Sequence, residues 1–156
     1  MNQDSIIENR LASLNLTLPV APDPVGNYLP FRISGNLIFL AGSICMRDGA
    51  MVYTGAVGAE RTVEEAVEAA RLCAINQLAI LKKAAGSLDR VKQMVSLAGF
   101  VWGVYGFSQS PAVINGASDL FVEVFEDKGR HSRTAVSVSG LPAGSTVELQ
   151  SVWEIV

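Results

Sequence analysis

The stretch "TVEEAVEAARLCAINQLAILKKAAG", residues 62–86, limits the possible folds more than any other part of the chain. Thr62 and Glu65 have the spacing of a capping box, lysines fall in the last turn, and Gly86 follows. A broad apolar stripe of mostly small residues repeats at helical spacing: Val63, Ala66, Val67, Ala70, Cys73, Ala74, Leu78 and Leu81. The pattern predicts a long helix that lies flat on a β-sheet.

Strand patterns occur on both sides of this helix. Three precede it and three follow it: residues 28–34, 36–44, 50–55, 91–104, 133–140 and 145–156. Ser5 and Glu8 suggest a second capping box, for a short N-terminal helix. Ser110 as N-cap and Pro111 at the first helical position suggest another helix after the fourth strand. This order predicts an α+β sandwich with helices on one sheet face, and we expect subunits to meet on the other.

Composition indicates which kinds of binding partner and cofactor to expect for this chain. Net charge is −3 over 156 residues with no dense Lys/Arg cluster, which argues against nucleic acid. No apolar run approaches the roughly 18–20 residues that span a bilayer, and no signal peptide is evident, so we expect a cytoplasmic protein without membrane attachment. The high hydrophobic content, 49%, favours a homo-oligomer. Cys45 and Cys73 lack metal-ligand spacing and are expected to be buried free thiols, with no metal or other cofactor.

Generic catalytic motifs are absent from the sequence, and a lone histidine, His131, is more typical of a solvated or capping residue. Arg133 opens a strand pattern in which small residues follow on its own face, so its guanidinium could bind a carboxylate with two hydrogen bonds. Glu148 alternates with apolar neighbours in the last strand. From pattern alone, both side chains are also compatible with ordinary solvated positions.

The segment "HSRTAVSVSGLPAGSTVELQSVWEI" closely resembles the C-terminal signature of the RidA/YjgF family of imine deaminases, formerly called L-PSP endoribonucleases. The resemblance continues upstream through "GNY", "GNLIFLAGSI" and "VINGASDLFVEVF", and covers residues 26–156. It implies a chorismate-mutase-like sandwich with a mixed, mainly antiparallel sheet, assembled as a barrel-like homotrimer. Residues 1–25 are then an N-terminal helix and proline-rich connector that precede this domain.

The family's functional positions can be placed on this chain one residue at a time. The resemblance implies that Arg133 binds the substrate carboxylate and that Glu148 positions the hydrolytic water. It also implies that five residues line the binding site: Tyr28, Ala41, Gly42, Asn115 and Ala135.

Three positions depart from the family pattern. Ala41 replaces a serine, His131 a proline and Ser118 an aromatic residue that would otherwise narrow the cleft. The implied activity is hydrolysis of small enamines or imines (2-imino acids) to 2-oxo acids and ammonia. The alternative is non-catalytic binding of small carboxylate metabolites in an intersubunit cleft, and a ribonuclease is disfavoured by the acidic charge balance.

A hairpin across "LPAG", residues 141–144, would pair the last two strands. Glu148 would then lie opposite residue 138, about 16 Å from Arg133 at about 3.3 Å per residue. Two groups so far apart cannot contact one small substrate. We therefore predict that Arg133 and Glu148 of different subunits form each site.

Overall fold

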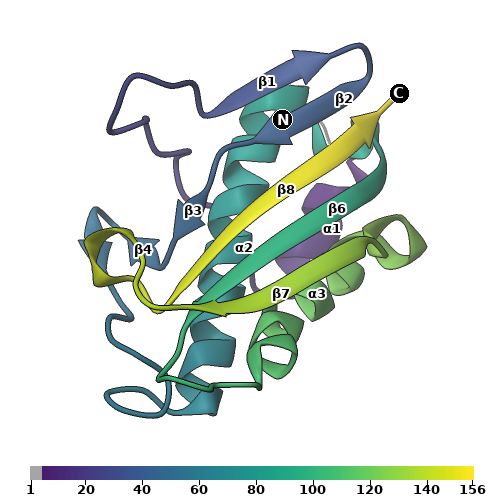
Figure 1. Cartoon of the computed structure of the whole chain (residues 1–156). Coiled ribbons are helices and arrows are strands. Elements are labelled where there is room, and N and C mark those ends of the chain that lie inside the picture. Colours follow the sequence, from purple (N-terminus) through teal and green to yellow (C-terminus); the bar gives the residue numbers. More distant parts are fainter. Residues whose placement is uncertain (1–4) are drawn as a thin grey trace.

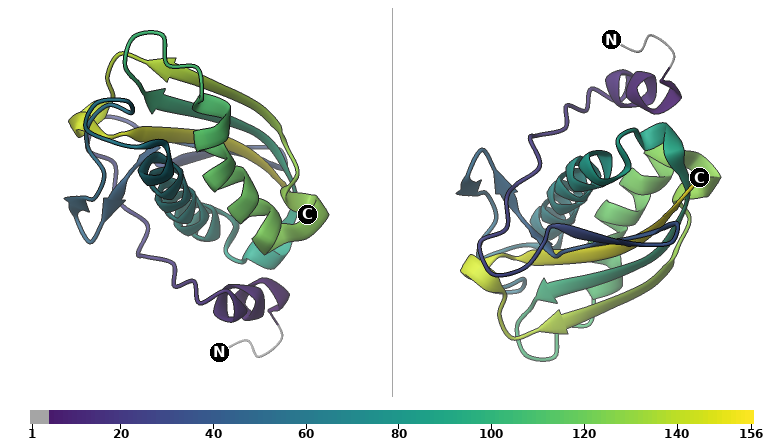
Figure 2. Two further views of the ribbon diagram at one scale, coloured as in Figure 1. Left: turned by 90° about the horizontal axis from the view of Figure 1, so that it is seen from below. Right: turned by 90° about the horizontal axis from the view of Figure 1, so that it is seen from above.

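The protein is described here by a computed structural model, which covers residues 5–156. One sheet has the strand order β1-β2-β8-β6-β7, β3 pairs with β8, and β4 and β5 form a separate ribbon. The helices lie on one face of the sheet, and the opposite face is open (Figures 1 and 2). In chain order the helices and strands are α1 (Ile6–Ser13), β1 (Phe31–Ser34), β2 (Leu37–Leu40), β3 (Ser43–Ile44), β4 (Met46–Arg47), β5 (Ala50–Met51), α2 (Val63–Ala85), β6 (Val91–Trp102), α3 (Ser110–Phe125), β7 (Ser132–Val138) and β8 (Val147–Ile155). The predicted α+β sandwich is confirmed.

The long helix α2 begins and ends as the sequence predicts. Thr62 and Glu65 form a complete capping box, and Gly86 ends the helix with a φ of 78°. The buried stripe is wider than predicted because it includes two amide side chains. Asn76 and Gln77 are 6% and 0% exposed and hydrogen bond to the segment around β3.

Two predicted helix starts need correction in detail. Ser5 caps α1 by accepting the Glu8 N–H at 3.1 Å, but the Glu8 carboxylate pairs with Lys82 at 2.8 Å instead of completing a capping box. Ser110 is the first residue of α3 and Gln109 is its N-cap, without a side-chain hydrogen bond. Pro111 therefore occupies the second helical position, where its missing N–H is still no loss.

The predicted hairpin between the last two strands is wrong. β6 lies between them, pairing in parallel with β7 and antiparallel with β8 (Figure 1). The nearly continuous apolar pattern of β6 fits an interior position in the sheet, with β8 on one side and the edge strand β7 on the other. The "LPAG" segment consequently crosses over from β7 to β8 at one end of β6 instead of forming a tight turn.

Strand alternation separates a buried face from the open one. In β8, Val147, Leu149, Ser151 and Trp153 are each 0% exposed beneath the helices, whereas the residues that alternate with them point to the open face. Apolar residues also occur on the open face, where Phe39 and Val136 are each 41% exposed. Among residues 5–156, no helix is long and apolar enough to cross a membrane.

The expected burial of both thiols is confirmed. Cys45 and Cys73 are free and fully buried, and their sulfur atoms lie 3.6 Å apart between α2 and β8.

Candidate functional site

Glu148 lies on the open face of β8, next to the short strand β3. The pairing of Ile44 with Glu148 brings the preceding residue pair, Ala41 and Gly42, beside the carboxylate. Glu148 is half-buried, and burial raises its pKa above the ordinary value of 4.5. Within residues 5–156, no side chain donates a hydrogen bond to it, so this carboxylate combines a raised pKa with acceptors available to a ligand or water.

Gly42 is needed for this arrangement. A Cβ atom at this position would collide with Oε1 of Glu148. The φ angle of Gly42 is outside the left-handed region, so its backbone does not itself require glycine. The absence of a side chain is therefore what allows the carboxylate to lie over the chain here.

Gln77 of α2 holds this segment from below. Its Nε2 donates to the Ala41 carbonyl at 2.9 Å and to Ser43 Oγ at 2.6 Å, while its Oε1 accepts from Ser151 at 2.6 Å. All these bonds are made by a side chain that is 0% exposed. Gln77 thus fixes residues 41–43 to the helix layer, a role that sequence reasoning missed because glutamine falls within an otherwise helical surface pattern.

Arg133 lies on the edge strand β7 and its side chain reaches α3. Nη1 donates to Asn115 Oδ1 at 2.8 Å and to Ser118 Oγ at 3.1 Å, and Nη2 donates to the Pro111 carbonyl at 3.2 Å. The three acceptors lie three or four residues apart along the helix and so share one face.

These contacts use part of the hydrogen-bonding capacity of the guanidinium. Arginine has five N–H donors, and both Nη1 hydrogens and one Nη2 hydrogen of Arg133 have acceptors within the chain. In residues 5–156, no acceptor is bonded to Nε. The Nε hydrogen and one Nη2 hydrogen remain, and a carboxylate can bridge these two nitrogens with parallel hydrogen bonds.

The other expected site residues divide between these two places. Ala135 follows Arg133 on the same face of β7 and packs against the core. Tyr28 is 52% exposed and lies two residues before Pro30, whose carbonyl accepts the Ala41 N–H at 2.9 Å. The structure thus places Tyr28, Ala41 and Gly42 on the Glu148 side, and Asn115 and Ala135 on the Arg133 side.

The two groups do not meet within one chain. Arg133 pairs with Leu97 of β6, and Glu148 pairs with Phe100. Three residues along β6 and two strand spacings across it separate their Cα atoms by about 14 Å. Leu97 is 2% exposed on the helix side, and an offset of three residues places Phe100 on the opposite face. Arg133 and Glu148 therefore project from opposite faces of the sheet.

Ser118 and His131 form an unexpected contact beside Arg133. Ser118 Oγ lies 3.0 Å from Nε2 of His131, and Nδ1 of the same ring lies 2.6 Å from the Gly129 carbonyl. From the sequence we expected Ser118 only to widen the cleft and His131 to be a capping or solvated residue. Two spacings in the sequence could have predicted this contact. Ser118 follows Asn115 by one helical turn, and His131 precedes Arg133 by two residues.

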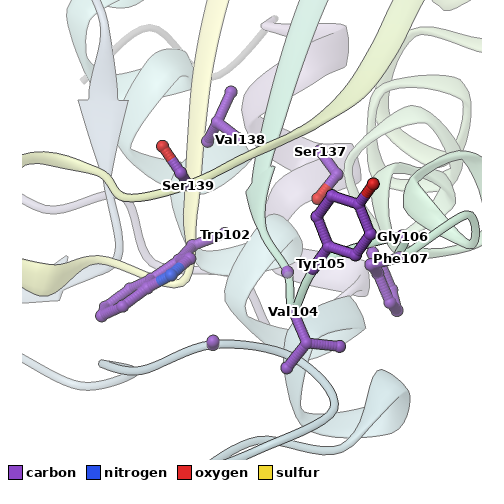
Figure 3. Close-up of a pocket in the computed structure, with 10 residues that line it drawn as sticks. Trp102, Val104, Tyr105, Gly106, Phe107, Ser137, Val138 and Ser139 are labelled. Atoms are coloured by element: carbon purple, nitrogen blue, oxygen red, sulfur yellow. The ribbon is translucent and has the colours of Figure 1, made fainter.

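A shallow cavity of about 570 Å³ lies elsewhere, beyond the ends of β6 and β7. Trp102 and Tyr105 lie on two sides of it, below Ser137 and Ser139 (Figure 3). It contains none of the expected site residues. In the part of the chain that the structure describes, no cluster of three or more His, Cys, Asp or Glu side chains could hold a metal ion.

Comparison with known proteins agrees with this arrangement of elements. Residues 8–152 match the family described as "YjgF/chorismate mutase-like, putative endoribonuclease". The chain belongs to the YjgF family. The RidA/YjgF resemblance expected from the sequence is thereby confirmed, together with its chorismate-mutase-like fold.

Three known proteins resemble this chain over most of its length. Protein TCP17 of Trypanosoma cruzi is 40% identical over 146 residues, which are 93% of this chain and 91% of that protein. A crystal structure of a protein of unknown function from Agrobacterium tumefaciens is 44% identical with a TM-score of 0.90, covering 96% of this chain and 92% of its own. A "putative endoribonuclease" from Shewanella oneidensis is 35% identical with a TM-score of 0.92, covering 96% and 99%.

A more distant YjgF family structure shares the fold alone. Escherichia coli TdcF, crystallised with bound serine, is 19% identical with a TM-score of 0.66, over 88% of this chain and 94% of its own.

Proposed function

We propose that this protein hydrolyses small enamines or imines, chiefly 2-imino acids, to 2-oxo acids and ammonia. The observation that carries the proposal is the partly satisfied Arg133 guanidinium, which is fixed to α3 on one side and keeps Nε–H for a ligand carboxylate. Family membership and the serine bound to TdcF, an amino acid with a carboxylate, support a small carboxylate-bearing ligand. The endoribonuclease description has no comparable support, because the net charge is −3.

The reaction requires a water molecule and a proton carrier. Arg133 would hold the substrate carboxylate and thereby fix the adjacent imine carbon. Glu148, ionised and half-buried, would accept a proton from the water as its oxygen bonds to that carbon. The same proton then passes to nitrogen, giving a carbinolamine. The hydroxyl proton of this carbinolamine passes to nitrogen in turn, by way of Glu148, as the carbonyl forms, the carbon–nitrogen bond breaks and ammonia leaves. The overall change is one imino acid plus one water giving one oxo acid plus one ammonia.

A homotrimer would combine the two groups of residues. Arg133 and Glu148 of one chain project from opposite faces of the sheet, so each complete site requires two subunits. The open face carries Phe39 and Val136 at the surface, which is apolar area that a neighbouring subunit would bury. Each trimer would have three equivalent sites, in which Arg133 with Asn115 and Ala135 faces Glu148 with Tyr28, Ala41 and Gly42 of the neighbour.

An assay of 2-aminoacrylate generated in situ tests the activity. Wild-type protein should accelerate ammonia release above the uncatalysed rate. Arg133→Ala should lower the acceleration at least about 100-fold, because substrate orientation is lost. Arg133→Lys is the matched control: it keeps the charge without the two-pronged hydrogen bonding, and should recover little of the activity. Equal release by all three proteins would exclude the deaminase, and pyruvate binding lost in Arg133→Ala would then indicate the non-catalytic binder.

The pH dependence should follow Glu148. Burial raises the pKa of this carboxyl, so the ionised base disappears at a higher pH than for an exposed glutamate. The acid limb of kcat/KM should accordingly lie above 4.5 and be absent from Glu148→Gln, which should be slow at every pH.

The same substitution that lowers activity should raise the stability of the folded protein. Ionised Glu148 disfavours the folded state, so Glu148→Gln should have the higher Tm near pH 7. The difference should shrink as pH falls through the raised pKa of Glu148 toward 4.5, and it should be absent below 4.5.

A further inference from the structure

The three polar side chains Arg133, Ser118 and His131 form a hydrogen-bond chain with a defined direction. Gly129 offers a carbonyl oxygen, which only accepts, so Nδ1 of His131 must carry the hydrogen in the 2.6 Å contact. In the neutral ring Nε2 is then an acceptor, and the Ser118 hydroxyl donates to it at 3.0 Å. The Ser118 oxygen in turn accepts from Nη1 of Arg133 at 3.1 Å. Each donated hydrogen in this series of hydrogen bonds therefore has one acceptor.

The neutral ring fits its surroundings. Burial lowers the pKa of His131 below its ordinary value of 6.5; the Gly129 carbonyl opposes this shift, and the Arg133 charge adds to it. The edge of the ring packs against Phe121, with centroids 6.1 Å apart. A protonated ring would instead direct a second cationic donor at the hydroxyl that already accepts from Arg133.

We propose that Ser118 and His131 are positioning residues for Arg133, which hold its Nη1 side so that the Nε edge faces the ligand carboxylate. This inference rests on the proposed function for the identity of the ligand, but not for the geometry of the chain of hydrogen bonds. Without Ser118, Nη1 would keep only its hydrogen bond to Asn115, beside the bond from Nη2 to the Pro111 carbonyl. Ser118 adds the second fixed point, and His131 fixes the orientation of the Ser118 hydroxyl so that its lone pair faces Arg133.

The tautomer of His131 can be measured directly, because it is the only histidine in the sequence. Long-range ¹H–¹⁵N spectra at pH 7 should show a neutral ring with hydrogen on Nδ1. In Ser118→Ala the resonances should shift toward those of a mixed tautomer population, because Nε2 loses its donor. A charged ring, or hydrogen on Nε2, in the wild type would overturn the proposal.

Pyruvate binding measured by calorimetry tests the effect on Arg133. Ser118→Ala should weaken binding about five- to tenfold, the loss expected for one hydrogen bond to a charged group, while Ser118→Thr should restore it. His131→Ala should weaken binding in the same sense. Because both residues act through the same series of hydrogen bonds, the double variant should bind pyruvate with an affinity no lower than that of the weaker-binding single variant. Additive losses, or wild-type affinity in Ser118→Ala with an unchanged Tm, would overturn the proposal.

Failure of the proposed function gives a different result. If the protein only binds small carboxylates, wild-type protein would bind pyruvate without releasing ammonia, and the calorimetric test would still apply. If it does neither, the His131 tautomer could still be measured. The exchange rate of the Arg133 Nε hydrogen, assigned by its loss in Arg133→Lys, covers this case. Faster exchange in Ser118→Ala than in wild type supports the positioning role, and equal exchange rejects it.

Discussion

Mixing unfolded Arg133→Ala and Glu148→Ala chains in equal amounts and refolding them together should restore about one quarter of wild-type deaminase activity. Each variant alone should lose at least about 100-fold, because each lacks one of the two groups in every site. In the proposed trimer a site would take Arg133 from one chain and Glu148 from its neighbour. Each is intact in half of the chains, so one site in four is complete. The expectation follows from the opposite-face placement of the two side chains.

The matched control is a mixture of the Arg133→Ala/Glu148→Ala double variant with Arg133→Ala. It has the same oligomeric state but no chain with an intact arginine, and it should stay inactive. Absence of recovery in the first mixture, with trimers confirmed by light scattering, would show that each site lies within one chain. A monomeric wild type would reject the shared site altogether.

Gly42→Ala should reduce kcat/KM at least about 100-fold. The added methyl group would occupy the place of Glu148 Oε1, so the carboxylate must move off the position from which it would reach a water. Displacement of a reacting group by about 1 Å is enough for a loss of this size. The change should fall mainly on kcat, because the Arg133 side of the site is untouched.

Gly140→Ala is the corresponding control. A Cβ at Gly140 meets nothing within 4 Å, and the residue has no positive φ. It should retain wild-type kcat/KM and Tm, whereas Gly42→Ala should lose activity while circular dichroism still shows the folded chain. Wild-type turnover by Gly42→Ala would mean that the carboxylate position next to Gly42 is not used in the reaction.

Several features of the fold were accessible from local sequence because local interactions determine them. The capping residues Thr62 and Glu65 and the terminator Gly86 act within one helical turn, so the bounds of α2 follow from the sequence. Strand alternation likewise predicted that Arg133 and Ala135 share a face. The predicted N-cap of α3, Ser110, was wrong by one residue, because a proline in the first helical turn is compatible with either Gln109 or Ser110 as the N-cap.

Local sequence did not predict which strands pair with each other. The segment "LPAG" has the composition of a turn, yet β7 and β8 do not pair, because β6, which precedes α3 in the chain, lies between them. The hairpin from which we predicted the separation of Arg133 and Glu148 is therefore wrong. The observed register nevertheless keeps these two residues of one chain too far apart to contact the same small molecule.

The candidate site shows the same division. Local patterns predicted the bounds of α2 and the alternation of strand faces, and the resemblance gave the family and the candidate site residues. Only the tertiary structure decided that Gln77 holds residues 41–43, that Gly42 makes room for Glu148, and that Ser118 and His131 reach Arg133. Such contacts join elements far apart in the chain, and their geometry depends on how helices and strands pack, which no local pattern specifies.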